Sequence, residues 1–304
     1  MHIAHNIRFS RILKNTWQVD LVMIISSTAA YLLHDRLITR YHLEIPALVP
    51  GVLGTAIAFF IGFNNNQAYD RWWEGRKIWG MLVNDSRSWA RNIISYVQLN
   101  HISEAEKLAI HGRMITRHIG FLYALKAALR GVNDPTYKNY LAGEEVEEVS
   151  KHSNIQNAIL LLQARELNEL SEKGYIDGYR YLQLDSLLVK LTDSMGMAER
   201  IKNTVFPTTY NYFTKVFIWL FVVSVALVLS PSMGIWSVFM SWLIGFVFIS
   251  TQINGMTLLN PFTNNSASLP LNQITRTIEI NLLQMLREVN IPEPVKPVND
   301  EYIL

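Results

Sequence analysis

The chain has 304 residues, of which 50% are hydrophobic and only 17% are charged, against about 25% charged residues in an ordinary soluble protein. Its 27 Lys and Arg residues nearly balance 25 Asp and Glu residues, which leaves no sign of a basic surface for nucleic acid. The sequence contains no cysteine, which excludes disulfides, thiolate catalysts and cysteine-based metal sites. Because the apolar residues gather in long blocks, this composition favours an integral membrane protein of one or two domains over a water-soluble enzyme.

Apolar blocks predict four membrane-spanning helices, at residues 20–33, 45–63, 216–229 and 235–253. The second and fourth blocks approach the ~20 residues that a bilayer requires, whereas the first and third are short. Each short block is joined to a longer one by a short connector, which favours two transmembrane hairpins. The alternative is that the short blocks are buried core helices. We therefore expect an all-α protein with four spans.

The positions of the basic residues predict how these spans are oriented. Arg8, Arg11 and Lys14 precede the first span, and five further basic residues follow the second span within residues 71–91. The two connectors carry no excess of positive charge. Because positively charged flanks stay in the cytoplasm, both termini and the long middle segment are expected to be cytoplasmic.

Between the two hairpins, residues 71–210 show a helical periodicity of apolar and charged faces. Turn sequences at 131–135 and 173–178 divide this segment, which predicts three to five amphipathic helices in a cytosolic domain. The proline-containing residues 291–297 cannot form a helix and should run extended. The predicted organisation is an N-terminal cytosolic segment, two spans, the helical cytosolic domain, two further spans, and a cytosolic C-terminal helix with an extended tail, at residues 1–19, 20–70, 71–210, 211–256 and 257–304.

The sequence offers little that could support catalysis. It contains no zinc-protease, nucleotide-binding or serine-hydrolase motif. His111 and His118 lie seven residues apart and share a helical face, but no third ligand accompanies them, so ordinary polar histidines are the better interpretation. We expect no enzyme activity, no cofactor and no metal site.

The second apolar block carries the most informative pattern. Pro46 and Pro50 stand at its start, where the missing N–H of proline is tolerated and its fixed φ favours helix initiation. Thr55, Phe59 and Phe63 follow at intervals of four residues and share one face of the helix. From this spacing alone, side chains that face lipid are the commoner explanation. The polar and aromatic residues after Phe63 suggest that the helix continues beyond the bilayer without a break.

Further short motifs follow in order along nearly the whole chain. They are Gly62-Phe63, Arg71-Trp72-Trp73, Phe206-Pro207, Asn260-Pro261-Phe262, Ser268-Leu269-Pro270-Leu271-Asn272 and residues 276–283. In this set the chain resembles the bestrophin family of ion channels, and the last two stretches look like its bacterial branch in particular. Each motif is short, but the ordered set is specific.

The resemblance implies a homopentamer whose central pore is lined by the second span, here residues 45–70. Thr55, Phe59 and Phe63 would form a narrow hydrophobic neck, which gates by excluding water. Thr55 occupies a position often held by Ile, so this neck would have two apolar rings and one polar ring. Phe206 would form a second constriction, the cytosolic aperture, although a core aromatic is the alternative. The motif residues expected to shape the pore helix and its surroundings are Pro46, Pro50, Gly62, Arg71, Trp72, Trp73 and Pro207.

The same resemblance bears on calcium and on the permeant ion. Animal members carry a run of acids after the Asn-Pro-Phe motif that clasps calcium, whereas residues 263–268 hold no carboxylate here, so we expect no calcium clasp. Animal members pass chloride, and the bacterial branch is known for monovalent cations. We expect a channel for Na⁺ or K⁺, with a chloride-permeable channel of the same fold or a non-conducting membrane scaffold as alternatives. The expected partners are the bilayer, further copies of the chain and the permeant ions, in a bacterial inner (plasma) membrane.

Overall fold

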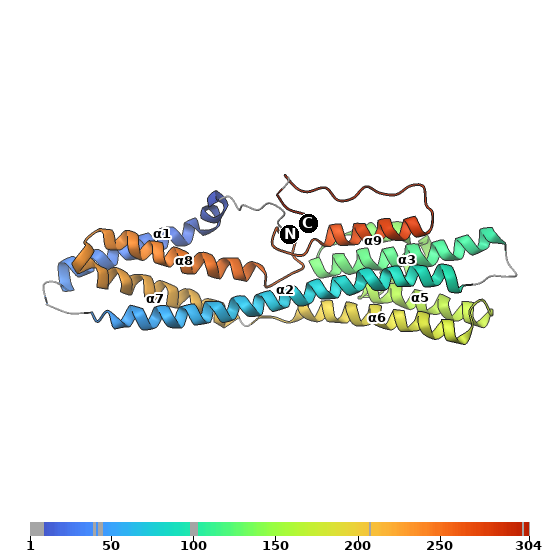
Figure 1. Ribbon diagram of the computed structural model, residues 1–304, viewed down its shortest axis with the longest axis horizontal. Helices are drawn as coiled ribbons and strands as arrows, with labels where there is room; N and C mark the ends of the chain where they lie inside the picture. Colours follow the sequence, from blue (N-terminus) through green and yellow to red (C-terminus); the bar gives the residue numbers. More distant parts are fainter. Residues whose placement is uncertain are drawn as a thin grey trace. The chain divides into compact units, whose positions relative to one another are not determined.

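The structure is a computed structural model that describes residues 9–38, 41, 45–97, 103–206, 208–299 and 301–303. These residues are nearly all helical (Figure 1). The one β-feature among them is an isolated bridge between Val298 and Tyr302. The expected all-α class is therefore confirmed, and residues 291–297 have no regular structure, as predicted from their prolines.

The chain divides into two compact units. The span unit comprises the described residues up to Arg71 together with Val205–Leu259. The second unit comprises Trp72–Thr204 and the described residues from Asn260 onward. One helix, α2, contributes residues to both units, and the C-terminal part of the chain belongs with the middle segment.

Four helices among the described residues are long and apolar enough to cross a bilayer, which confirms the predicted number of spans. They are α1 (Phe9–Leu33), α2 (Leu48–Tyr96), α7 (Thr208–Met233) and α8 (Trp236–Thr257), and the π-helical turn η1 (His34–Ile38) follows α1. Two of these helices begin well before their apolar blocks, α1 at Phe9 and α7 at Thr208. Polar residues extend a helix as readily as apolar ones, so hydropathy marks the bilayer-crossing part and not the helix end.

In the span unit, α1, α7 and α8 pack against one another. Gly245 of α8 permits this packing, because an added Cβ would lie 2.4 Å from Val222 Cγ2 and 2.9 Å from Met23 Sδ. Small residues allow such close approach of helices in membranes. The buried apolar core of this unit is Met23, Ile57, Ile61, Ile218, Phe221, Val222, Val225 and Ile249.

The second unit is a bundle of helices around a separate core. Besides the end of α2 it contains α3 (Glu104–Arg130), the 3₁₀-helix η2 (Pro135–Tyr140), α4 (Gly143–Ser150), α5 (Ile155–Glu172), α6 (Gly178–Asn203) and α9 (Leu271–Met285). Both predicted turns are present, with Gly131 at φ 67° and Gly174 at φ 68°, backbone conformations that favour glycine. The largest buried side chains of this core include Trp79, Trp89, Phe121 and Phe262.

Ion pairs inside the second unit fix α3 against α4 and α5. Arg117 of α3 is buried and pairs with both Glu145 of α4 and Glu166 of α5. Arg113, one turn earlier on α3, pairs with the same Glu166. Because each buried charge has a partner, this network avoids the cost of an uncompensated charge.

Candidate pore-lining face of α2

The helix α2 is unbroken over 49 residues, so the prediction that it continues past Phe63 is confirmed. Its start follows from the two prolines. Pro46 lies just before the helix and its carbonyl accepts a hydrogen bond from the Val49 N–H at 3.0 Å. Pro50 lies in the first turn, where the backbone N–H groups have no partner within the helix and the missing one costs nothing.

Within the span unit, α2 has one buried face and one exposed face. Ile57 and Ile61 are nearly inaccessible and belong to the core of the unit. Phe59 and Phe63 lie on the opposite side with 71% and 51% of their surfaces exposed. Large apolar side chains left uncovered in a single copy of a chain indicate contact with lipid, a partner or a pore.

Thr55, the third member of the predicted neck, is also exposed. Its hydroxyl donates a hydrogen bond to the Gly51 carbonyl at 3.0 Å, one turn earlier in the same helix. The hydroxyl proton is therefore used within the helix, while the oxygen lone pairs stay available to water. The structure places Thr55, Phe59 and Phe63 on one exposed helical face, and their role as a neck stays a prediction.

A belt of amide side chains follows directly after Phe63. Asn64 donates to Thr214 Oγ1 of α7 at 3.4 Å, and Asn65 donates to the Thr251 carbonyl of α8 at 3.2 Å. Gln252 of α8 donates to the side chain of Asn211 of α7 at 3.3 Å. The belt therefore ties α2, α7 and α8 together immediately beyond the exposed phenylalanines.

Sequence reasoning noted the polar run after Phe63 but missed this belt. The signal that pointed to it was the abrupt change from apolar residues to Asn64-Asn65-Asn66-Gln67 inside a continuing helix. Its partners on α7 and α8 could not be identified, because they lie about 150 to 190 residues away in the chain.

The remaining predicted residues lie in different surroundings. Gly62 is exposed and an added Cβ would meet nothing within 4 Å, so this chain itself does not require glycine there. Trp72 donates its indole N–H to the Ala267 carbonyl at 3.1 Å and stacks on Trp73 at a centroid distance of 6.5 Å. Arg71 is half-buried and has interactions of its own.

The predicted aperture lies apart from the helices. Phe206 is partly exposed in the non-helical connection between α6 and α7. Pro207 lies outside the described residues. Phe206 makes no ring contact with Phe59 or Phe63 in the part of the chain that the structure describes, and its role as a constriction stays a prediction.

The loop in which we expect no calcium clasp, residues 260–268, is held by neutral groups. Asn260 accepts from the Phe262 N–H at 3.3 Å, and Asn265 accepts from the Ser268 N–H at 2.9 Å. The Thr263 and Ser268 hydroxyls share a hydrogen bond of 2.7 Å. These oxygens are engaged within the loop itself. Over the ranges with described coordinates, no group of three or more His, Asp or Glu side chains is placed so that it could hold a metal ion.

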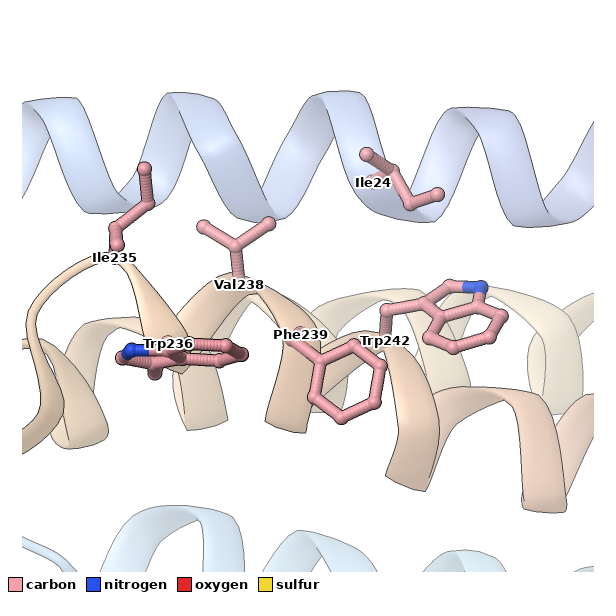
Figure 2. Close-up of a pocket in the computed structure, with 6 residues that line it drawn as sticks. All are labelled: Ile24, Ile235, Trp236, Val238, Phe239 and Trp242. Atoms are coloured by element: carbon pink, nitrogen blue, oxygen red, sulfur yellow. The ribbon is translucent and has the colours of Figure 1, made fainter.

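An apolar groove of about 410 Å³ lies between α1 and α8 (Figure 2). Ile24 comes from α1, and the other lining residues come from α8 and the residue before it, namely Ile235, Trp236, Val238, Phe239 and Trp242. None of these side chains carries a charge. The groove therefore suits hydrocarbon chains better than a polar substrate, as expected for helices in a bilayer.

The chain is similar to several known bacterial proteins. "Voltage-dependent anion channel-forming protein YneE" of Escherichia coli O157:H7 is 30% identical over 249 residues, covering 81% of this chain and 79% of the relative. The protein of the same name from Salmonella typhi is 31% identical over 242 residues, covering 79% of this chain and 77% of the relative. A crystal structure of a bacterial bestrophin homolog from Klebsiella pneumoniae superposes with a TM-score of 0.80 at 28% identity, covering 89% of this chain and 98% of that chain.

The sequence also matches the family described as "Bacterial/Fungal Bestrophin protein" over residues 3–284. The match includes all four apolar helices and most of the second unit. This chain belongs to the bacterial and fungal bestrophin family of membrane channel proteins.

Proposed function

We propose that this protein is a homopentameric channel for monovalent ions, with a central pore lined by α2. The observation that carries the proposal is the exposed α2 face with Phe59 and Phe63, which a single copy of the chain leaves uncovered. Five such helices around an axis would turn these side chains into two apolar rings, with Thr55 forming a polar ring before them. Family membership supports channel activity, and nothing in the described residues supports an enzyme.

The neck would gate by wetting and drying. An ion crossing an apolar ring loses hydration without gaining ligands, so the rings conduct only when they are wide enough to hold water. Phe206 is proposed as the second, cytosolic constriction. The polar loop 260–268 supports a channel that opens without a calcium clasp, because it offers no carboxylate to a hard cation.

Two candidate selectivities have separate support. The resemblance to the bacterial branch favours monovalent cations such as Na⁺ and K⁺, and this is the selectivity that we propose. The names of the relatives describe anion channel-forming proteins, which favours chloride. A non-conducting membrane scaffold would keep the fold but pass no current.

The proposed location is a bacterial inner membrane, with both termini and the second unit in the cytoplasm. The basic residues before the apolar part of α1 and after the apolar part of α2 support this orientation. Trp17 of α1 and Trp236 of α8 are exposed, and their amphipathic rings are suited to the membrane–water interfaces.

The test is the reversal potential of the purified protein in planar bilayers under a salt gradient, with a Phe59→Ala, Phe63→Ala double variant beside the wild type. A potential near that of Na⁺ supports the cation channel, and one near that of Cl⁻ supports the anion channel. The double variant should conduct more because its neck is wider. An unchanged conductance would contradict the neck assignment, and an absence of current from both proteins would favour the scaffold.

A further inference from the structure

Asp70 is the first charged residue on α2 after the exposed phenylalanines. At about 100° per residue, its position around the helix axis lies about 20° from that of Phe59 and about 20° from that of Phe63. Its side chain is exposed, as theirs are. Seven residues of helix place it roughly 10 Å beyond Phe63 along the axis. Asp70 therefore continues the same exposed face.

No basic side chain pairs with Asp70 among the residues with described side chains. Asp70 makes no hydrogen bond or ion pair there. The adjacent Arg71 is half-buried, about 100° further around the helix, and engaged in interactions of its own. The other described basic side chains of the span unit, Arg36 and Lys215, belong to η1 and α7.

Further along α2, the next charges differ from Asp70. Glu74 is paired with Arg200 of α6 at 2.6 Å, which offsets its charge. Arg76 and Lys77 are exposed, but they follow six and seven residues later, roughly 9 and 10 Å along the helix and so about a Debye length away at physiological ionic strength. Asp70 is thus the unpaired charge on α2 closest to the predicted neck.

We propose that Asp70 sets a preference for monovalent cations in this channel. The inference rests on the proposed pentameric pore, in which five Asp70 carboxylates form a ring at the inner end of the neck. The rings of Phe59 and Phe63 offer no charged ligand and so discriminate weakly between ions of opposite sign. A ring of carboxylates attracts hydrated cations and repels anions, and the apolar walls beside it focus the field.

The experiment compares wild-type protein with Asp70→Asn in planar bilayers under a NaCl gradient. The ratio of Na⁺ to Cl⁻ permeability is expected to fall roughly tenfold in Asp70→Asn, the lower end of what focused charge achieves. Asp70→Glu keeps the charge and should keep the ratio. Glu147→Gln makes the same change of charge at an exposed position on another helix, α4 of the second unit, and should leave the ratio unchanged.

The possible outcomes separate this inference from the proposed function. No current from the wild type would contradict the channel itself. A conducting wild type whose selectivity is the same in Asp70→Asn, or one that prefers Cl⁻, would overturn the role of Asp70 alone. If Asp70→Asn fails to assemble on size exclusion, the dependence of wild-type conductance on NaCl concentration tests the role of Asp70 instead. A carboxylate ring concentrates Na⁺ in the pore, so the conductance in dilute NaCl should exceed the value expected from strict proportionality to salt concentration. Strict proportionality would overturn the inference.

Discussion

At the scale of single residues, His118 shows how burial fixes a protonation state in the second unit. Its side chain is fully buried, and its Nε2 lies 2.8 Å from Ser86 Oγ. The Ser86 hydroxyl donates its proton to the Leu82 carbonyl, so Nε2 must donate to Ser86. The other ring nitrogen, Nδ1, is buried without a partner. A proton added at Nδ1 would create a buried positive charge whose N–H has no hydrogen-bond acceptor.

This environment predicts that acid destabilises the protein through His118. Burial lowers the pKa of His118 to about 3, whereas an unfolded histidine titrates near 6.5. Between these two pKa values the unfolded state binds a proton that the folded state does not bind. The free energy of unfolding therefore has its full value at neutral pH and falls as the pH drops below about 6.5. The expected loss is about 1.4 kcal/mol per pH unit, or about 2 kcal/mol at pH 5. Thermal unfolding of the detergent-solubilised protein at pH 7 and pH 5 measures it.

Two variants assign this dependence to His118. His118→Gln cannot gain the proton, so its stability should change less between pH 7 and pH 5 than that of the wild type. The exposed His152 has no such environment, and His152→Gln should behave as the wild type does. Equal pH dependence in all three proteins would contradict the prediction.

Arg130 is a cation without a carboxylate partner among the described residues. Its Nη1 donates to Asn272 Oδ1 of α9 at 2.8 Å, while its Nε and Nη2 are buried without partners. Burial lowers the pKa of Arg130, because a desolvated charge is disfavoured. The nearby Asp134 carboxylate is instead paired with Lys126 at 3.3 Å.

Asn272→Asp is therefore expected to stabilise the protein by about 1 kcal/mol, because a charged acceptor strengthens the existing hydrogen bond. The midpoint of thermal unfolding should therefore be higher for Asn272→Asp than for the wild type. Asn281→Asp is the matched control, since Asn281 accepts from Arg87 at an exposed site where solvent screens the pair. A gain at Asn281 as large as that at Asn272 would show that burial of Arg130 is not the cause.

At the scale of helices, the sequence predicted best those features that depend on residues within a single helix. The continuation of α2 beyond Phe63 and the common face of Thr55, Phe59 and Phe63 follow from spacing within one helix. The starts of α1 and α7 did not follow, because polar residues precede both apolar blocks. Contacts between helices also could not be predicted, since they depend on which faces meet.

The contact between α2 and α8 illustrates this and yields a prediction. Asn65 fits against Gly255, where an added Cβ would lie 1.7 Å from Asn65 Oδ1. Gly255→Ala should displace Asn65, break its hydrogen bond to the Thr251 carbonyl, and cost about 1–3 kcal/mol by overpacking. Thermal unfolding in detergent measures the loss.

Gly112 in α3 provides the control for this substitution. An added Cβ there meets nothing within 4 Å, so Gly112→Ala should be neutral or stabilise the helix by about 0.5–1 kcal/mol. A variant that shortens residue 65, Asn65→Ala, should restore room for alanine at position 255. If Gly255→Ala were as stable as the wild type, the close fit between α2 and α8 would be refuted.

At the scale of the whole molecule, the span unit exposes large apolar side chains on several helices. Phe59 of α2, Trp219 of α7 and Trp236 of α8 each expose 44% or more of their surfaces. Periodicity in the sequence identifies such faces but cannot say which one meets lipid and which one meets another copy or a pore. The assignment of the α2 face to the pore therefore depends on the family resemblance and on conductance measurements.

Thr55 gives a direct test of how that face works in the assembled channel. If the neck controls wetting, Thr55→Ile should lower the single-channel conductance by a factor of a few, because it converts the polar ring into a third apolar ring. Thr55→Ser keeps the hydroxyl that bonds to the Gly51 carbonyl and should conduct as the wild type does. Single-channel recordings in symmetric NaCl compare the three proteins. Because the isoleucine change affects only an exposed side chain, equal conductance with an intact pentamer would mean that this face does not line the pore.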